Sequence, residues 1–260
     1  MLHHLFQSLF LAAAAFIAGI INSVAGGGGF IAFPALIAAG LLPIQANATN
    51  TVALWPGQLT SIAAYREDLR KNLRIVLPVI TVAAIGGLGG SWTLLHHSQT
   101  SFLHLVPWLF LLGATSFALS GPISRRIKAR AAAHEGSPER IYLAPLLFLL
   151  LCITFYIGYF GAGAGLLTMT AISLCGVERI AEINALKTVI TTVANLVAVV
   201  VFIAWHAVDW RFCWFMMITC AIGGYTGARN ARRISDRILR PIIIALGFAI
   251  ALWFFTHRTL

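Results

Sequence analysis

The feature that most constrains this chain of 260 residues is an apolar unit that occurs twice, the second copy 137 residues after the first. Asn47-Ala48 in the first copy corresponds to Asn184-Ala185 in the second. Upstream, four successive glycines at 26–29 correspond to the alternating Gly-Ala stretch at 161–165. Duplicated apolar units interrupted by glycine are typical of secondary transporters, and the broken segments indicate where a substrate binds.

The composition indicates that lipid surrounds the chain. Hydrophobic residues make up 59% of it and charged residues only 10%, and the mean hydropathy is +0.88. A soluble domain needs about 25% charged residues to cover its surface. The sequence therefore predicts an all-α polytopic membrane protein. The first apolar segment, 5–25, lacks the features of a signal peptide, so we expect it to remain as a transmembrane helix.

Ten apolar segments are expected to be helical, and most approach the ~20 residues that a bilayer span needs. Segments 29–42 and 164–176 are shorter, and each follows a glycine run. At 1.5 Å per residue they reach about 20 Å, less than the ~30 Å of hydrocarbon. The ten segments are 5–25, 29–42, 47–64, 75–95, 102–120, 141–160, 164–176, 183–205, 212–228 and 241–256.

The charges of equivalent loops favour a five-plus-five inverted repeat with two short broken segments. Loop 65–74 carries four basic residues, whereas its counterpart at 206–211 carries only Arg211. Loop 96–101 carries no Lys or Arg, whereas its counterpart at 229–240 carries five Arg. In the alternative topology, both short segments are re-entrant and the two halves are parallel. The positive-inside rule disfavours that alternative.

Basic residues gather in three loops, which we expect to be cytoplasmic, with both termini outside. Fourteen of the 18 Lys and Arg residues lie in loops 65–74, 121–140 and 229–240. The expected organisation is a first transmembrane repeat at 1–120, a basic cytoplasmic linker at 121–140 and a second transmembrane repeat at 141–260.

Several function classes are disfavoured. The formal net charge of +10 lies mainly in loops, so nucleic acid is not an expected partner. The four cysteines form no C-x-x-C motif, and we expect no metal site and no cofactor. Asp68, Asp209 and Asp236 lie in expected loops and no phosphate-binding glycine motif is present. We therefore expect no catalytic residues and no enzyme.

A polar stretch follows each short segment and leads into the next long helix. It includes Asn47 and Asn50 in the first half, and Asn184 and Lys187 in the second. Helix N-termini carry free N–H groups and partial positive charge, so two converging N-termini would form an anion site. Capping of the helices by the same side chains is the structural alternative.

Lys187 occupies the place that Asn50 has in the first repeat. An ionisable side chain at membrane depth costs at least ~2.5–3.5 kcal/mol and usually marks a transport pathway. The alternative is an ion pair with Glu182 or Glu178, with the ammonium extended towards the interface. We favour a role in binding substrate.

The glycines also have two interpretations. Extended backbone at membrane depth must be buried in protein or line a polar cavity, and we expect the breaks at 26–29 and 161–165 to line a substrate cavity. A four-residue spacing inside a long segment instead indicates close helix packing. That second pattern is formed by Gly86, Gly90, Gly223 and Gly227.

The candidate substrate-binding residues come from both glycine breaks, from the polar stretches and from a further pair of repeat mates, Gln58 and Asn195. In full they are Asn22, Ser23, Gly26, Gly27, Gly28, Gly29, Asn47, Thr49, Asn50, Thr51, Gln58, Gly161, Gly163, Gly165, Asn184, Lys187, Thr188 and Asn195.

These motifs resemble those of a known family. The stretch from Asn22 to Phe30, with Pro34 and the later Asn47-Ala-Thr-Asn-Thr51, resembles the first signature of the TauE/SafE sulfite exporter family, also called the toluene-sulfonate-uptake permease family. Gly158 to Gly165, followed by Asn184-Ala-Leu-Lys187-Thr188, resembles its second signature. The resemblance covers essentially the whole chain.

The resemblance implies a multi-pass transporter of the bacterial inner membrane for a small sulfur-containing anion such as sulfite, a sulfonate or sulfoacetate, with export as the default direction. The implied partners are the small anionic substrate and the lipid bilayer, and a homo-oligomer is left open. Two departures, the alanines within the second glycine run and Lys187, leave the substrate open. The alternative is a non-transporting membrane assembly or sensory protein with the same fold.

Overall fold

The computed structural model describes residues 2–25, 27–58, 73–133, 142–177, 179–230 and 236–256. These residues form ten helices and no strand, which confirms the all-α prediction. In the first half the helices are α1 (Leu2–Ala25), α2 (Gly29–Ala38), α3 (Pro43–Leu54), α6 (Leu73–His96) and α7 (Gln99–Ala133). In the second half they are α8 (Leu143–Tyr159), α9 (Ala164–Leu174), α10 (Ile180–Ala204), α11 (Trp210–Asn230) and α12 (Asp236–Thr256).

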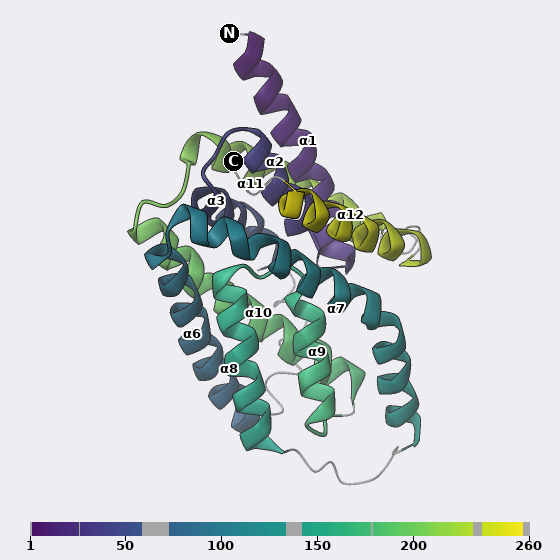
Figure 1. The fold of residues 1–260 in the computed structure, drawn as a ribbon. Helices are drawn as coiled ribbons and strands as arrows, with labels where there is room; N and C mark the ends of the chain where they lie inside the picture. The colour runs from purple at the N-terminus through teal and green to yellow at the C-terminus, as the bar shows by residue number, and fades with distance from the viewer. Residues whose placement is uncertain are drawn as a thin grey trace.

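Equivalent helices of the two halves make equivalent contacts. Helix α1 packs along α11, and its counterpart α8 packs along α6, the counterpart of α11. The counterparts α3 and α10 contact each other, as do α7 and α12. Helix α1 descends from the N-terminus in Figure 1, whereas α8 rises from the lower end. The repeat in the sequence is therefore a structural repeat whose two halves have opposite orientations. Helices α1 and α6 of the first half pack along α11 and α8 of the second half.

Glycines form the two main seams between the halves. A Cβ on Gly86 of α6 would clash with the hydroxyl of Thr154 and the carbonyl of Leu151 on α8. A Cβ on its repeat mate Gly223 of α11 would clash with the carbonyl of Phe16 on α1. The predicted close packing is confirmed at these positions, because only glycine lets the two backbones approach so closely.

The two short helices end in the same way. Helix α2 has 10 residues and α9 has 11, so each is only about 15–17 Å long. Gly40 and Gly176 follow them with φ of 91° and 98°, a left-handed conformation. In each case the glycine N–H and the next N–H bond back to helix carbonyls, which is a Schellman motif. The repeat-equivalent glycines thus stop both helices well before they could span a bilayer.

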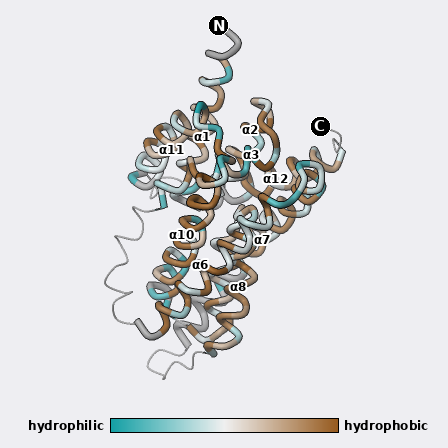
Figure 2. The backbone as a smooth tube through the Cα atoms, turned by 90° about the vertical axis from the view of Figure 1, so that its left-hand side faces the viewer, coloured by the Kyte–Doolittle hydropathy of each residue, from teal (hydrophilic) through white to brown (hydrophobic). Residues whose placement is uncertain are grey.

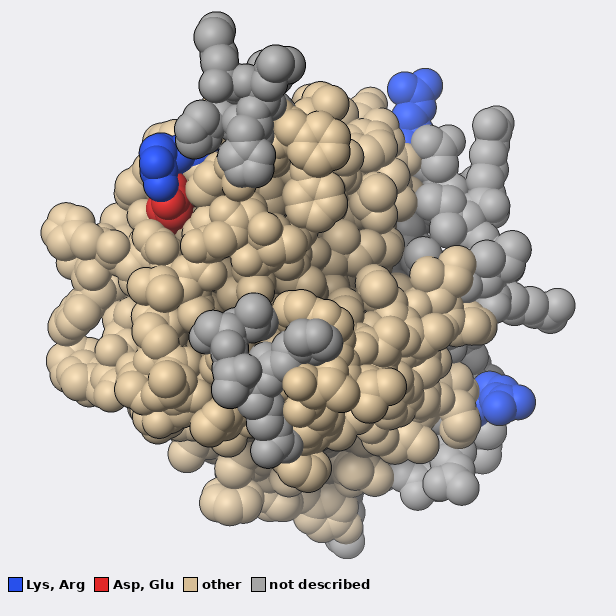
Figure 3. Space-filling view, turned by 45° about the horizontal axis from the view of Figure 1, so that its top comes forward, with Lys and Arg blue, Asp and Glu red and all other residues tan. Residues whose placement is uncertain are grey.

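The outer surface suits a bilayer. Within the described residues, four helical stretches are long and apolar enough to cross a membrane: Phe6–Ser23, Ile75–His96, Gln99–Leu119 and Glu182–Ala204. Large apolar side chains such as Leu77 and Phe148 point outward, with 70% and 67% of their surface exposed. Apolar residues dominate the long helices in Figure 2. Figure 3, drawn from another side, shows few charged side chains among the described residues of the face in view. The protein is a polytopic membrane protein.

Some boundaries differ from those expected. Helix α3 begins at Pro43 and α10 at Ile180, earlier than the expected 47 and 183. Helix α7 continues to Ala133, so the first part of the expected linker is helical. Much of the three basic loops, at 65–72, 134–140 and 231–235, lies outside the described residues. Their common cytoplasmic side and the division of the chain into two repeats and a linker stay predictions.

Candidate functional site

The second break depends on two glycines in a left-handed conformation. Helix α8 ends at Tyr159, and Gly161 and Gly163 follow with φ of 78° and 76°. The buried hydroxyl of Tyr156 donates a 2.6 Å hydrogen bond to the carbonyl of Ala162. Residues with a Cβ rarely adopt this backbone, so both glycines are required by conformation, and Tyr156 holds the turn between them.

The first break is tighter and uses glycine for another reason. Gly28 has right-handed angles (φ −57°, ψ −33°), so its conformation does not demand glycine. A Cβ there would lie 2.5 Å from the carbonyl oxygen of Ala18. A Cβ on Gly27 would lie 3.1 Å from the ring of Phe117. Packing therefore explains Gly27 and Gly28, and Gly26 lies outside the described residues.

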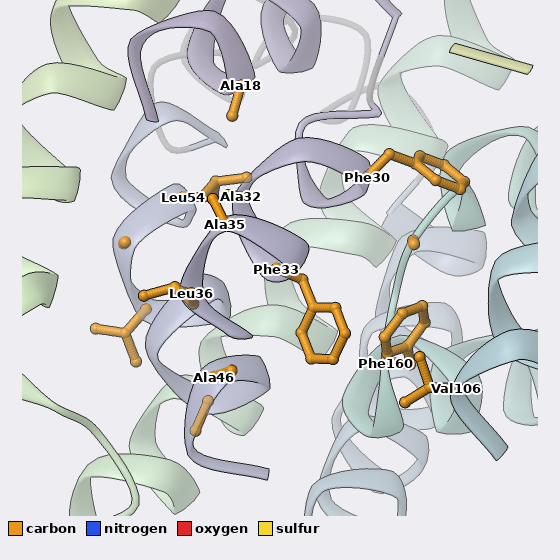
Figure 4. Close-up of a cluster of buried hydrophobic side chains, with 14 of the residues drawn as sticks. Ala18, Phe30, Ala32, Phe33, Ala35, Leu36, Ala46, Leu54, Val106 and Phe160 are labelled. Carbon is orange, nitrogen blue, oxygen red and sulfur yellow. The ribbon is translucent and has the colours of Figure 1, made fainter. Parts of the chain in front are cut away.

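The two breaks converge on one aromatic core. Phe33 of α2 and Phe160 of the second break meet edge to face, with ring centroids 5.5 Å apart, and Figure 4 shows the two rings side by side. A Cβ on Gly113 of α7 would lie 2.7 Å from the ring of Phe30 and 2.8 Å from the carbonyl oxygen of Ala162. The breaks thus approach each other, and the space between them is partly filled by apolar side chains. Whether they line a substrate cavity stays a prediction.

Each short helix starts beside the same position of the following helix. A Cβ on Gly29, the first residue of α2, would lie 3.5 Å from Nδ2 of Asn50. A Cβ on Gly165, in the first turn of α9, would lie 3.9 Å from Cδ of Lys187. The two halves therefore present an equivalent polar side chain to an equivalent helix N-terminus, neutral in one half and cationic in the other.

Lys187 lies on α10 within a membrane-spanning stretch, and its side chain is partly buried. Among the described residues, no hydrogen bond or ion pair is found for its ammonium group, whereas Arg211 pairs with Asp209 at 3.1 Å. Glu182, one of the two predicted partners, is buried, and Glu178, the other, lies outside the described residues. The Cδ of Lys187 lies beside Gly165, so the side chain passes close to the start of α9.

The polar residues are not helix caps. The N-cap residues of α3 and α10 are Leu42 and Arg179, and neither makes a side-chain capping bond. The hydroxyls of Thr51 and Thr188 instead donate to the carbonyls of Asn47 and Asn184, at 2.9 and 2.8 Å. The capping interpretation is wrong because both helices start earlier than expected. The N-termini that lie beside the polar stretches are those of α2 and α9.

Residues at equivalent positions of the two repeats contact each other where α3 and the residues after it, 55–58, cross α10. Nε1 of Trp55 donates to the carbonyl of Thr192 at 3.4 Å. Nδ2 of Asn195 donates to Oε1 of Gln58 at 3.2 Å. Each pair consists of residues 137 positions apart, the repeat offset. Equivalent residues touch only near the axis that relates the two halves, so this crossing marks the pseudo-two-fold axis.

Two predicted residues have structural partners elsewhere. The Ser23 side chain is exposed, and its hydroxyl donates to the carbonyl of Ile20 in its own helix. Thr49 is fully buried and accepts a 2.9 Å bond from the backbone N–H of Asp209. Asn22 lies against Gly28, at the end of α1. Ser23 and Thr49 thus support the α1–α11 seam and the start of α11, away from Lys187.

Sequence reasoning missed several residues that shape the breaks. Tyr159 accepts a 3.1 Å bond from Nδ2 of Asn47 at its carbonyl, and its hydroxyl bonds Nδ1 of His97 at 2.9 Å. Tyr156 donates a hydrogen bond to the carbonyl of Ala162 in the second break, and Gly113 packs against the same carbonyl. The usable signal was the pair of tyrosines before the break, because a buried tyrosine hydroxyl usually has a partner.

Comparison with known proteins finds a matching family and several relatives. The family described as "Sulfite exporter TauE/SafE" matches residues 11–254. The chain is 28% identical over 257 residues to "Probable membrane transporter protein ORF9" of Sinorhizobium sp, covering 96% of this chain and 92% of the relative. It is 25% identical over 232 residues to "Probable membrane transporter protein YfcA" of Escherichia coli K12, with 88% and 82% covered. A "Probable membrane transporter protein" of Haemophilus influenzae is 25% identical over 237 residues, with 90% and 88% covered.

Proposed function

Since the chain belongs to the TauE/SafE sulfite exporter family, we propose that it is a secondary transporter of a small sulfur-containing anion, such as sulfite, a sulfonate or sulfoacetate, in the bacterial inner membrane. Export is the default direction that the family name suggests. The observation that carries the proposal is the position of Lys187, a cation within a membrane-spanning helix and beside the N-terminus of α9.

The proposed anion site combines two sources of positive potential. The helix dipole places partial positive charge at the start of α9. The N–H groups of Ala164 and Leu166 bond to the carbonyls of Gly161 and Gly163, at 3.4 and 3.3 Å, whereas no bond is found among the described residues for the N–H of Gly165. Lys187 adds a full charge beside Gly165. Gly165 has no side chain to cover the N-terminus, so an anion can approach the backbone. Asn184 lies one turn before Lys187 on the same helix and supplies an amide at the edge of the site.

The proposed transport cycle uses the repeat. Each half contains a short helix, a break and a long helix, and equivalent residues meet at the crossing of α3 and α10. Rocking of one half against the other about that crossing would expose the anion site to each side of the membrane in turn. The amide pair Gln58–Asn195 lies at the crossing and would act as the contact about which the halves move.

The test is a binding screen on the purified protein. Sulfite, thiosulfate, sulfate, sulfoacetate and taurine would each be titrated while thermal unfolding and the heat of binding are recorded. We expect at least one sulfur oxyanion or sulfonate to bind and to raise the Tm, and Lys187→Ala to lose that effect. Absence of binding by every member of the panel would contradict the proposed substrate class.

A further inference from the structure

Two side-chain oxygens of α3 are buried without a protein partner. Oδ1 of Asn47 and Oδ1 of Asn50 have no hydrogen bond within the described part of the chain. Only 1% of Asn47 and 7% of Asn50 is exposed. An acceptor left without a donor in such a place costs about 1–3 kcal/mol. A protein retains two of them in adjacent turns when something else satisfies them.

The orientation of the Asn47 amide is determined by its surroundings. Its Nδ2 donates to the carbonyl of Tyr159 at 3.1 Å, so Oδ1 is the atom without a partner. Tyr159 is the last residue of α8, where the helix dipole is negative. Asn47 and Asn50 are three residues apart on α3, so their Cβ atoms are about 5–6 Å apart and both oxygens can reach one ion. The two oxygens and the negative end of α8 favour positive charge, and they oppose the partial positive charge at the start of α2, which lies beside Nδ2 of Asn50.

We propose that Asn47 and Asn50 bind a monovalent metal cation, and sodium is the ion used to test the site. Amide side chains do not titrate, so a proton cannot be the ligand. Neutral oxygens alone suit a monovalent ion, because divalent calcium and magnesium are usually held by carboxylates. Asp209, which contacts the neighbouring Thr49 through its backbone, has its carboxylate engaged by Arg211.

The repeat relates this place to the cation of the second half. Asn50 is the counterpart of Lys187, and each lies beside the start of a short helix. In the second half the protein supplies the cation covalently, as an ammonium group. In the first half the equivalent residue, Asn50, is neutral: its Nδ2 lies beside Gly29 and its Oδ1 has no partner in the described part of the chain. A sodium ion bound to that oxygen would supply the charge. The cation site and the proposed anion site would then lie on either side of the second break, at the negative end of α8 and the positive start of α9.

The site would be tested by thermal unfolding of the detergent-purified protein in NaCl, KCl and choline chloride at equal ionic strength, without any sulfur anion. We expect sodium to raise the Tm by about 3 °C when its concentration is tenfold above the dissociation constant. Asn50→Leu should raise the Tm in choline chloride, because it removes an unpaired buried amide, and should abolish the sodium response. Asn50→Asp should lower the Tm without sodium and enlarge the sodium response.

Ser116→Ala is the matched control, because Ser116 is equally buried and its hydroxyl is satisfied by the carbonyl of Leu112. It should keep the full sodium response. Equal Tm values in the three salts, or an undiminished sodium response in Asn50→Leu, would overturn the proposal and assign the two oxygens to bound water. Coupling of sodium to the anion rests on the proposed function. A sodium response without anion binding would retain the cation site and reject the transport proposal.

Discussion

Nδ2 of Asn195 lies 3.2 Å from Oε1 of Gln58, and the two residues hold the same position in the two repeats. A direct bond between repeat mates requires the pseudo-two-fold axis to pass between them. The axis therefore crosses the molecule at α3 and α10, the two helices that also carry Asn50 and Lys187. The proposed anion and cation sites are consequently related by the same axis, although their charges differ.

The amide pair at the axis should be energetically coupled. Gln58→Ala and Asn195→Ala should each lower the free energy of unfolding by about 0.5–1.5 kcal/mol. The double variant should cost less than the sum of the single ones, because either change already breaks the bond. Thermal or denaturant unfolding of the four proteins measures this. Strict additivity would mean that the bond does not form in the membrane protein.

The glycine seam can be tested with neighbouring positions of α6. Gly90→Ala should destabilise by about 1–3 kcal/mol, since its Cβ would clash with the carbonyl of Phe155 and lie 2.7 Å from the backbone nitrogen of Tyr159. Gly89→Ala is the control, because its Cβ would make ordinary 3.4 Å contact with the Phe155 ring. It should be neutral or slightly stabilising. Equal Tm values for both variants would contradict the α6–α8 packing.

The second break should be sensitive to backbone conformation. Gly163→Ala should cost about 1–2 kcal/mol from its left-handed φ of 76° alone, and more because its Cβ would lie 2.9 Å from Cα of Gly113. Gly165→Ala, two residues on, has an ordinary φ and room for the methyl group, so its Tm should stay near that of the wild type. A lower Tm for Gly165→Ala than for Gly163→Ala would contradict this description of the second break.

The topology can be tested by labelling. Single cysteines in loops 65–74, 121–140 and 229–240, in a background without the four native cysteines, should all resist a membrane-impermeant thiol reagent added outside intact cells. The same positions should react after the cells are opened. Labelling of 229–240 but not of 65–74 in intact cells would support parallel halves and reject the inverted arrangement.

Local signals made the short helices predictable. The glycine breaks precede α2 and α9, and Gly40 and Gly176 end them through bonds within a few residues. The starts of α3 and α10 were placed too late because the polar residues resembled caps. Pro43, which favours the first turn of a helix, was the signal that correct placement of α3 needed.

The features of the site that the sequence did not predict depend on contacts between residues far apart in the chain. Nothing near Gly28 in the sequence indicates that Ala18 leaves no room for a side chain there. The bond from Asn47 to Tyr159 joins residues 112 positions apart, and it converts an expected cap into a contact between the halves. The unpaired oxygens of Asn47 and Asn50 become visible only when their surroundings are known.

The central claim is that Lys187 compensates the charge of the transported anion, and flux through proteoliposomes tests it most directly. Lys187→Ala should reduce sulfite or sulfonate flux at least about tenfold, because a charge-assisted contact is lost where water cannot replace it. Its Tm should stay near that of the wild type. Lys187→Arg should retain part of the flux with altered selectivity, and Arg229→Ala, a change at an exposed cation in the last turn of α11, should transport normally. Wild-type flux in folded Lys187→Ala, or a collapse of Tm that Lys187→Arg restores without restoring flux, would contradict the account.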